Sequence, residues 1–168
     1  ISIPSNDTSW IVTRLMQALK KKDPEYFGYR YHCDENDMVV GVVWQSGIAR
    51  AALRAYGGRS FFDCRLSEGM NAICYVYCAW VVIDPNNKFI PGSESILLGE
   101  TDELYKFMQM SSVEMTPGFS PKDLELAFGD DKIDGKKLKE YFPNITVMLD
   151  TFHFIVGNRG ISILSTDF

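Results

Sequence analysis

Two apolar segments of the chain end in aspartate, and a pair of such residues can hold catalytic metal ions. Asp63 closes the run Phe61-Phe62-Asp63, and Asp130, with Asp131 beside it, follows the run 124–128. An ionised carboxylate in an apolar strand is costly unless it is paired or bound to a metal. Enzymes that cleave phosphodiesters use carboxylates from separate strands to hold two hard cations about 4 Å apart. The two positions therefore predict the beginnings of a two-metal site.

Each of these aspartates also has a purely structural interpretation. Asp63 is suited to capping the turn after its strand, and Asp130 and Asp131 are suited to a turn and the N-cap of the next helix. A third carboxylate normally completes a two-metal site. Glu100 opens a predicted helix, where the helix dipole favours a carboxylate, so we assign Glu100 to the helix rather than to a metal.

Asp150 and His153 place a carboxylate and an imidazole three residues apart, beyond the last predicted strand. A histidine among aromatic residues is usually a hydrogen-bonded structural residue, and the local sequence favours that interpretation. Two lysine clusters, at 20–22 and at 132–139, are interpreted first as helix-surface charge, with contacts to a DNA backbone as the alternative.

The four cysteines are predicted to be reduced thiols in the core. Cys33, Cys64, Cys74 and Cys78 show no short paired spacing, and the chain starts without a secretory signal. Cys74 and Cys78 lie four apart in a predicted strand, which is the wrong spacing for a zinc site. We therefore expect an intracellular protein.

Periodicity and turn residues predict the elements that position these side chains. The last third of the chain alternates helix and strand after three successive strands. The expected helices are 10–22, 45–56, 101–110 and 135–142, and the expected strands are 27–33, 38–44, 60–63, 72–83, 88–98, 124–128 and 145–149. The turn 34–37 joins the first two strands as a hairpin, and the turn 84–87 makes its flanking strands antiparallel neighbours.

The order from residue 60 onward is three strands, helix, strand, helix and strand, which is the order of the ribonuclease-H-like α/β fold with its mixed sheet. In that fold the first and fourth strands lie side by side, so Asp63 and Asp130 would meet. We expect residues 1–58 to form an N-terminal helix, a β-hairpin and a helix that lead into the core, and residues 59–168 to form the core itself.

Length and composition limit the classes of protein that fit. The chain has 168 residues, 46% of them hydrophobic, and a formal net charge of −5. A chain of this size buries enough apolar surface to fold without a structural metal or disulfides. Its longest apolar runs fall short of the roughly 18 residues that a membrane-spanning helix needs, so no membrane partner is expected. The acidic balance argues mildly against a large nucleic-acid-coating surface.

The ordered set of signals resembles the transposase domain of Mutator-like DNA transposons, the group that also gave rise to domesticated plant transcription factors. The resemblance covers the chain from its first helix to about Asn158. It is carried by Val42-Val43-Trp44, by Arg50 and Tyr56-Gly57, by Phe61-Phe62-Asp63, by Val81-Val82-Ile83-Asp84 with Asn87, by Leu97-Leu98-Gly99-Glu100-Thr101, by Ala127-Phe128-Gly129-Asp130-Asp131, by Tyr141-Phe142-Pro143-Asn144 and by Asp150-Thr151-Phe152-His153.

The resemblance implies roles for the candidate site residues. Asp63 and Asp130 would be the first two members of an Asp-Asp-Glu triad that binds Mg²⁺ or Mn²⁺, with Asp131 as the alternative to Asp130. Asp150 and His153 would assist in positioning DNA. The sequence departs from the family where Cys64-Arg65-Leu66-Ser67 replaces a Thr-containing segment. The catalytic Glu of the family lies far downstream, beyond Phe168.

Three functions follow as expectations. The first is the catalytic core of a Mutator-like transposase, which in its intact form cleaves DNA and transfers strands in the nucleus, and which is inactive as this chain alone. The second is a domesticated binding module that contacts DNA or a protein partner without catalysis. A third possibility is another ribonuclease-H-like nuclease, which cleavage of an RNA–DNA hybrid would reveal.

Overall fold

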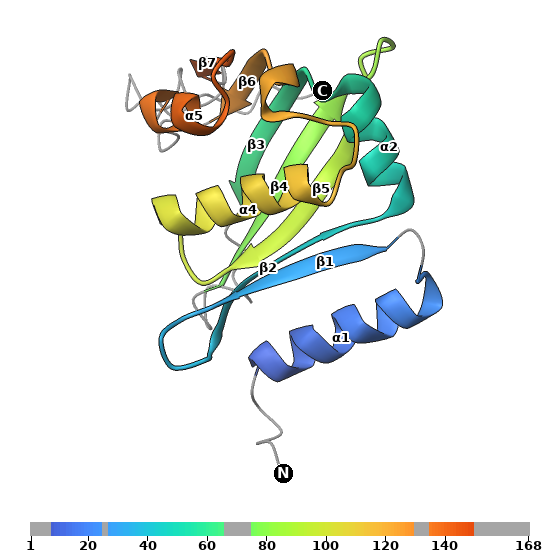
Figure 1. Ribbon diagram of the computed structural model, residues 1–168, viewed down its shortest axis with the longest axis vertical. Coiled ribbons are helices and arrows are strands. Elements are labelled where there is room, and N and C mark those ends of the chain that lie inside the picture. Colours follow the sequence, from blue (N-terminus) through green and yellow to red (C-terminus); the bar gives the residue numbers. More distant parts are fainter. Residues whose placement is uncertain (1–7, 25–26, 66–74, 130–134, 150–168) are drawn as a thin grey trace, which may run out of the picture.

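The computed structural model describes residues 8–24, 27–65, 75–129 and 135–149. Helices and one seven-stranded mixed sheet make up this part of the protein (Figure 1). The helices are α1 (Thr8–Lys22), α2 (Gly47–Tyr56), α4 (Asp102–Glu114), the short 3-10 helix η1 (Pro121–Asp123) and α5 (Gly135–Tyr141). The strands are β1 (Gly28–Cys33), β2 (Val39–Gln45), β3 (Arg59–Arg65), β4 (Val76–Ile83), β5 (Phe89–Leu97), β6 (Leu126–Gly129) and β7 (Thr146–Leu149).

The sheet has the order β1-β2-β5-β4-β3-β6-β7. β3, β4 and β5 are antiparallel neighbours, whereas β6 runs parallel to β3 and β7 runs parallel to β6. The predicted mixed α/β architecture is therefore confirmed, as is the adjacency of the first and fourth strands of the expected core. The β1–β2 hairpin extends the same sheet, because β2 pairs with β5.

Short-range polar contacts form the two predicted turns and the start of α4. The side chains of Asp34 and Asp84 each accept hydrogen bonds from backbone N–H groups two and four residues ahead. Asp37 and Asn87 adopt positive φ in these two turns. Thr101 accepts a hydrogen bond from the Leu104 N–H and so caps α4, which continues past the predicted end at Met110 to Glu114.

Different helices cover the two faces of the sheet. Val43 of β2 lies in the main core, with the fully buried Leu53 of α2 and Trp80 of β4. Its neighbour Val42 lies in a second cluster with Met16 of α1. Because successive side chains of a strand point to opposite faces, α1 covers the face opposite to the main core. Figure 1 shows α4 crossing the sheet on the core side and α1 packed beside β1 and β2.

Close packing also explains the end of α2. Gly57 caps the helix, and its backbone N–H bonds to the Leu53 carbonyl at 2.8 Å. A Cβ atom at this position would lie 2.3 Å from that carbonyl oxygen and 2.4 Å from a ring carbon of Phe119. The site has no room for a side chain, so the glycine lets α2 pack against the 115–120 loop.

None of the helices in the described part of the chain is long and apolar enough to cross a membrane.

Candidate functional site

Asp63 lies within β3 rather than at its end, and its side chain is exposed. The buried Phe62 beside it packs on Trp80, with ring centroids 4.8 Å apart. Strand alternation therefore turns Asp63 to the face opposite to the main core. The predicted end of the strand at Asp63 is wrong, because β3 continues to Arg65. Exposure leaves the carboxylate hydrated and accessible to a cation.

β6 brings a second chain segment beside Asp63. The parallel pairing joins Arg59 with Leu126 and Phe61 with Phe128, and the rings of Phe61 and Phe128 stack with centroids 4.6 Å apart. Phe61 lies two residues before Asp63 and therefore on the same face of the sheet. Asp130 and Asp131 directly follow β6 and lie outside the described residues, as do Asp150 and His153.

Glu94 is a carboxylate of this face that the sequence analysis did not single out. Asp63 pairs with Ala79 of β4, and Ala79 pairs with Glu94 of β5. Directly paired residues project to the same face, so Asp63 and Glu94 share a face with the small Ala79 between them. The polar Ser93-Glu94-Ser95 run in a strand was the only sequence signal for Glu94.

Tyr77 holds the Glu94 carboxylate in place. Its hydroxyl donates a hydrogen bond of 2.7 Å to Glu94 Oε1, and the pair is partly buried. Burial raises the pKa of Tyr77 well above its ordinary value, and the bond to Glu94 and the charge of Glu94 raise it further. The phenol therefore stays protonated and remains a donor to Glu94 throughout the neutral range.

The described residues do not by themselves complete a metal centre. No group of three or more His, Cys, Asp or Glu side chains in residues 8–24, 27–65, 75–129 and 135–149 is arranged to hold an ion. Asp63 supplies the oxygen donor that hard divalent cations prefer.

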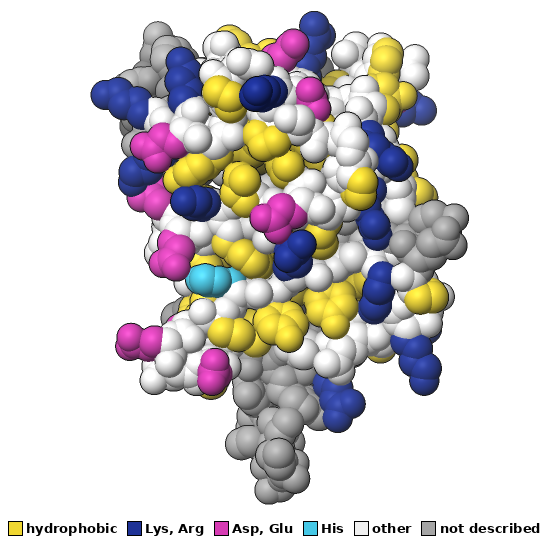
Figure 2. All heavy atoms as spheres, viewed as in Figure 1, with side chains coloured by type: hydrophobic (Ala, Val, Ile, Leu, Met, Phe, Trp, Pro, Cys, Tyr) yellow, Lys and Arg dark blue, Asp and Glu magenta, His cyan; other side chains and the backbone are white. Residues whose placement is uncertain are grey.

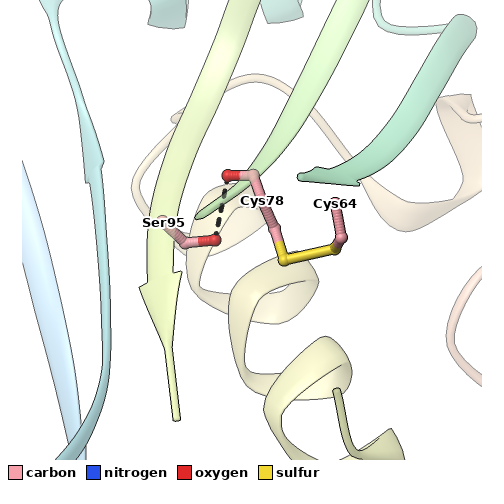
Figure 3. The surroundings of a disulfide bond; sticks show 3 residues. All are labelled: Cys64, Cys78 and Ser95. Carbon is pink, nitrogen blue, oxygen red and sulfur yellow. Dashed lines mark hydrogen bonds between the residues drawn. A yellow bond between two sulfur atoms is a disulfide. The ribbon is translucent and has the colours of Figure 1, made fainter. Parts of the chain in front are cut away.

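A disulfide joins β3 and β4 next to Asp63 (Figure 3). Cys64 and Cys78 are directly paired across the two strands, with Cα atoms 4.0 Å apart, and their sulfur atoms are bonded. The Cys78 carbonyl accepts a hydrogen bond from the Ser95 hydroxyl at 3.1 Å. The prediction of reduced thiols is wrong for these two cysteines, because strand register brings together residues 14 apart in the sequence. Cys33 is a free thiol, and Cys74 lies outside the described residues.

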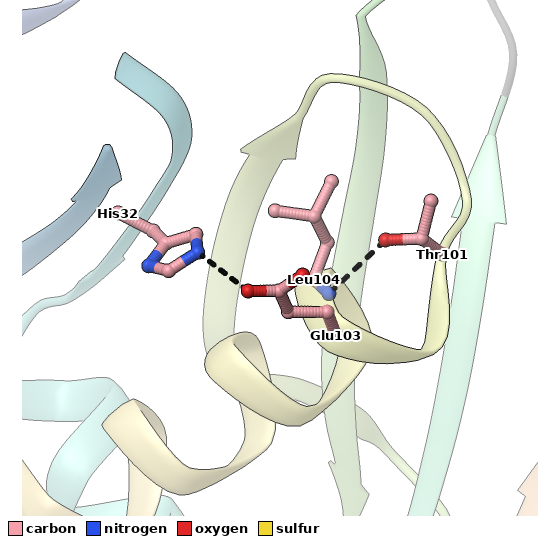
Figure 4. A network of polar contacts seen from close by, with 4 residues as sticks. All are labelled: His32, Thr101, Glu103 and Leu104. Carbon is pink, nitrogen blue, oxygen red and sulfur yellow. Dashed lines mark hydrogen bonds and ion pairs between the residues drawn. The ribbon is translucent and has the colours of Figure 1, made fainter. Parts of the chain in front are cut away.

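A separate polar group links β1 to α4 on the other face of the sheet. His32 Nε2 lies 3.2 Å from Glu103 Oε1, near the capped start of α4 (Figure 4). The His32 ring also stacks on Phe107 with centroids 5.3 Å apart. These contacts border a cavity of about 610 Å³ between β1 and α4, where Arg30 also pairs with Glu114 at 3.3 Å. Arg30 faces the oppositely charged Glu114, and His32 contacts both Glu103 and Phe107, so this group ties β1 to the helix.

Comparison of the chain with protein-family models, with curated proteins and with solved structures found no match.

Proposed function

We propose that the chain is the ribonuclease-H-like core of a Mutator-like DNA transposase, a nuclear enzyme whose intact form cleaves DNA and transfers strands with Mg²⁺ or Mn²⁺. The observation that carries the proposal is the arrangement of β5-β4-β3-β6-β7. Counted from β3, the strands stand in the order third, second, first, fourth and fifth, with the first three antiparallel and the last two parallel to the first. This order makes β6, the strand that directly precedes Asp130, a neighbour of the strand that carries Asp63.

The proposal assigns Asp63 and Asp130 as metal ligands. Phe61 pairs with Phe128, and each aspartate follows its phenylalanine by two residues. Pairing that continues for two more residues would therefore align the aspartates, and it favours Asp130 over Asp131, which is one residue out of step. When bound, two divalent cations would activate the attacking water or 3′-hydroxyl and stabilise the leaving oxygen. Asp150 and His153 would help to position DNA.

The second candidate function is a transposase-derived module that binds DNA or a protein partner without catalysis. One observation favours it: α1 and α2 carry six basic residues and no acidic residue, although the chain is acidic overall. A binding module needs such a surface but does not need the metal site. The two candidates therefore make different predictions for Asp63.

Calorimetric titration with Mn²⁺ tests the assignment of the site. We expect the wild-type chain to bind Mn²⁺, and Asp63→Asn and Asp130→Asn each to abolish the binding. Glu35→Gln is the matched control, because it removes an exposed carboxylate at the tip of the β1–β2 hairpin. Binding that survives both aspartate substitutions would refute the assignment. A wild-type chain that binds no Mn²⁺ favours the binding module, and the same titration on a longer form that includes a downstream Glu then decides between the two.

A further inference from the structure

α1 and α2 carry only basic charged residues, whereas the protein as a whole is acidic. The charged residues of α1 are Arg14, Lys20, Lys21 and Lys22, and those of α2 are Arg50 and Arg54. Neither helix contains Asp or Glu, whereas the whole chain has 22 acidic against 17 basic residues. A local excess of charge of one sign raises the potential for a ligand of the opposite sign.

Side chains of the two helices reach the first residues of β1 from opposite faces of the sheet. The Lys20 ammonium donates a hydrogen bond of 2.6 Å to the Phe27 carbonyl. A Cβ atom on the next residue, Gly28, would lie 3.4 Å from Nη2 of Arg50. Since consecutive Cα atoms are only about 3.8 Å apart, these contacts bring the Lys20 ammonium and the Arg50 guanidinium to the same end of β1.

Exposed cations continue on both sides of this junction. Lys21 and Lys22 are exposed at the end of α1, and Arg54 is exposed one turn beyond Arg50 on α2. Figure 2 shows Lys and Arg side chains in a row along the right-hand side, where Figure 1 places α2 and the C-terminal end of α1, with no Asp or Glu side chain visible within the row. Asp23, directly after α1, is the nearest acidic residue along the chain.

We propose that this basic face, formed by Arg14, Lys20, Lys21, Lys22, Arg50 and Arg54, binds the phosphate backbone of duplex DNA. Lysine and arginine side chains suit phosphates without reading bases, so the face positions DNA and does not select a sequence. β5 and β4 separate β2, which α1 and α2 both contact, from Asp63 on β3. DNA bound to the basic face would therefore lie at a distance from Asp63, on the part of the duplex that flanks the site of cleavage. This inference rests on the proposed function for its choice of DNA among polyanions.

The test compares two variants of equal net charge by fluorescence anisotropy with a labelled DNA duplex. The first, K21Q/K22Q/R54Q, removes three exposed cations of the basic face. The control, K88Q/K106Q/K122Q, removes three exposed cations that lie outside α1, α2 and the lysine cluster at 132–139. Each lost phosphate contact reduces the magnitude of the slope of log affinity against log salt concentration by about 0.9. We therefore expect the slope of the first variant to be smaller by roughly 2 to 3, and its affinity at low salt to fall more than tenfold. The control should stay within about threefold of wild type if its lysines make no phosphate contact.

Several outcomes would refute the proposal that the basic face binds DNA. These are equal losses in the two variants, a wild-type chain that binds no duplex at low salt, and binding to phosphatidylserine vesicles without binding to DNA. Thermal unfolding followed by circular dichroism checks that both variants fold. Mn²⁺ titration of K21Q/K22Q/R54Q separates this inference from the proposed function, because the metal site depends on Asp63 and not on α1 or α2. Lost DNA binding with retained Mn²⁺ binding supports both proposals.

Discussion

Asp63 of β3 and Glu94 of β5 project from the same face of the sheet, one on each side of Ala79. Two strand spacings separate them, so their Cα atoms are about 10 Å apart. Ala79 has the shortest side chain that a non-glycine residue can place between them. The two carboxylates thus lie on the same strip of the sheet, where the Tyr77 hydroxyl donates a hydrogen bond to Glu94.

Replacing Asp63 should stabilise the protein when no metal is present. Aspartate is disfavoured in strands and threonine is favoured, so Asp63→Thr should raise the free energy of unfolding by up to about 1 kcal/mol in urea titrations with a chelator. Added Mn²⁺ should then stabilise the wild type and leave the variant unchanged. A variant that is less stable than wild type in chelator would show that Asp63 has a structural role instead.

The Tyr77–Glu94 pair should make stability fall at high pH. The pKa of Tyr77 is raised in the folded state above its ordinary value near 10, first by burial and then by Glu94. Its contribution to stability is therefore fully present below pH 10 and declines as the pH rises above 10 towards the folded pKa. Denaturant unfolding as a function of pH should show this decline in wild type and a smaller decline in Tyr77→Phe.

Glu94→Gln should lower the pKa of Tyr77 only part of the way, because burial remains. The ultraviolet absorbance of tyrosinate, taken as the difference between each protein and its Tyr77→Phe counterpart, isolates this titration. Tyr31→Phe serves as the control, since 52% of the Tyr31 residue surface is exposed. An unchanged Tyr77 titration in Glu94→Gln would contradict the role given to the hydrogen bond.

The Cys64–Cys78 disulfide should contribute measurably to stability. It closes a loop between residues 14 apart, and closing a loop of this length is worth about 3 kcal/mol through the unfolded chain. A thiol reductant should lower the free energy of unfolding of wild type by about that amount and leave Cys64→Ala/Cys78→Ala unaffected. The Cys33→Ala control should respond as wild type does. Equal unfolding midpoints with and without reductant would count against the bond.

Gln45 should be a costly residue to replace because its polar atoms are buried. Its amide donates to the Gly92 carbonyl at 2.9 Å and lies 3.0 Å from Thr116 Oγ1, and both side chains are only 1% exposed. Gln45→Leu removes the donor to the Gly92 carbonyl and leaves the Thr116 hydroxyl with its bond to the Ser112 carbonyl, and should cost about 2 to 3 kcal/mol in urea unfolding. The exposed Gln17→Leu should change stability by less than about 0.5 kcal/mol.

A double-mutant cycle with Thr116→Val separates this network from simple loss of packing. The double variant removes both partners at once, so its cost should be less than the sum of the single costs by about 0.5 kcal/mol or more. Strictly additive costs would show that Gln45 and Thr116 act independently.

The local structure of this protein was predictable from its sequence because the contacts that form it are short in range. Asp34 and Asp84 form their turns with residues at most four ahead, and Thr101 caps α4 three residues away. Hydrophobic periodicity predicted the helices and strands, and their order predicted that β3 and β6 would be neighbours. The prediction of a metal site at Asp63 and Asp130, and of the fold family, remains a proposal.

Tertiary structure alone decided which side chains meet across the sheet. Strand register pairs Cys64 with Cys78 and places Glu94 on the same face as Asp63. The residues that this register brings together are 14 to 31 positions apart in the sequence, so no local pattern specifies it. The contact of His32 with Glu103 spans 71 residues. The alternation of Phe62 and Asp63 is visible in the sequence, but which of the two becomes buried depends on where the helices pack. Local patterns specify elements, and only the packing of those elements determines which face is covered and which stays open to water.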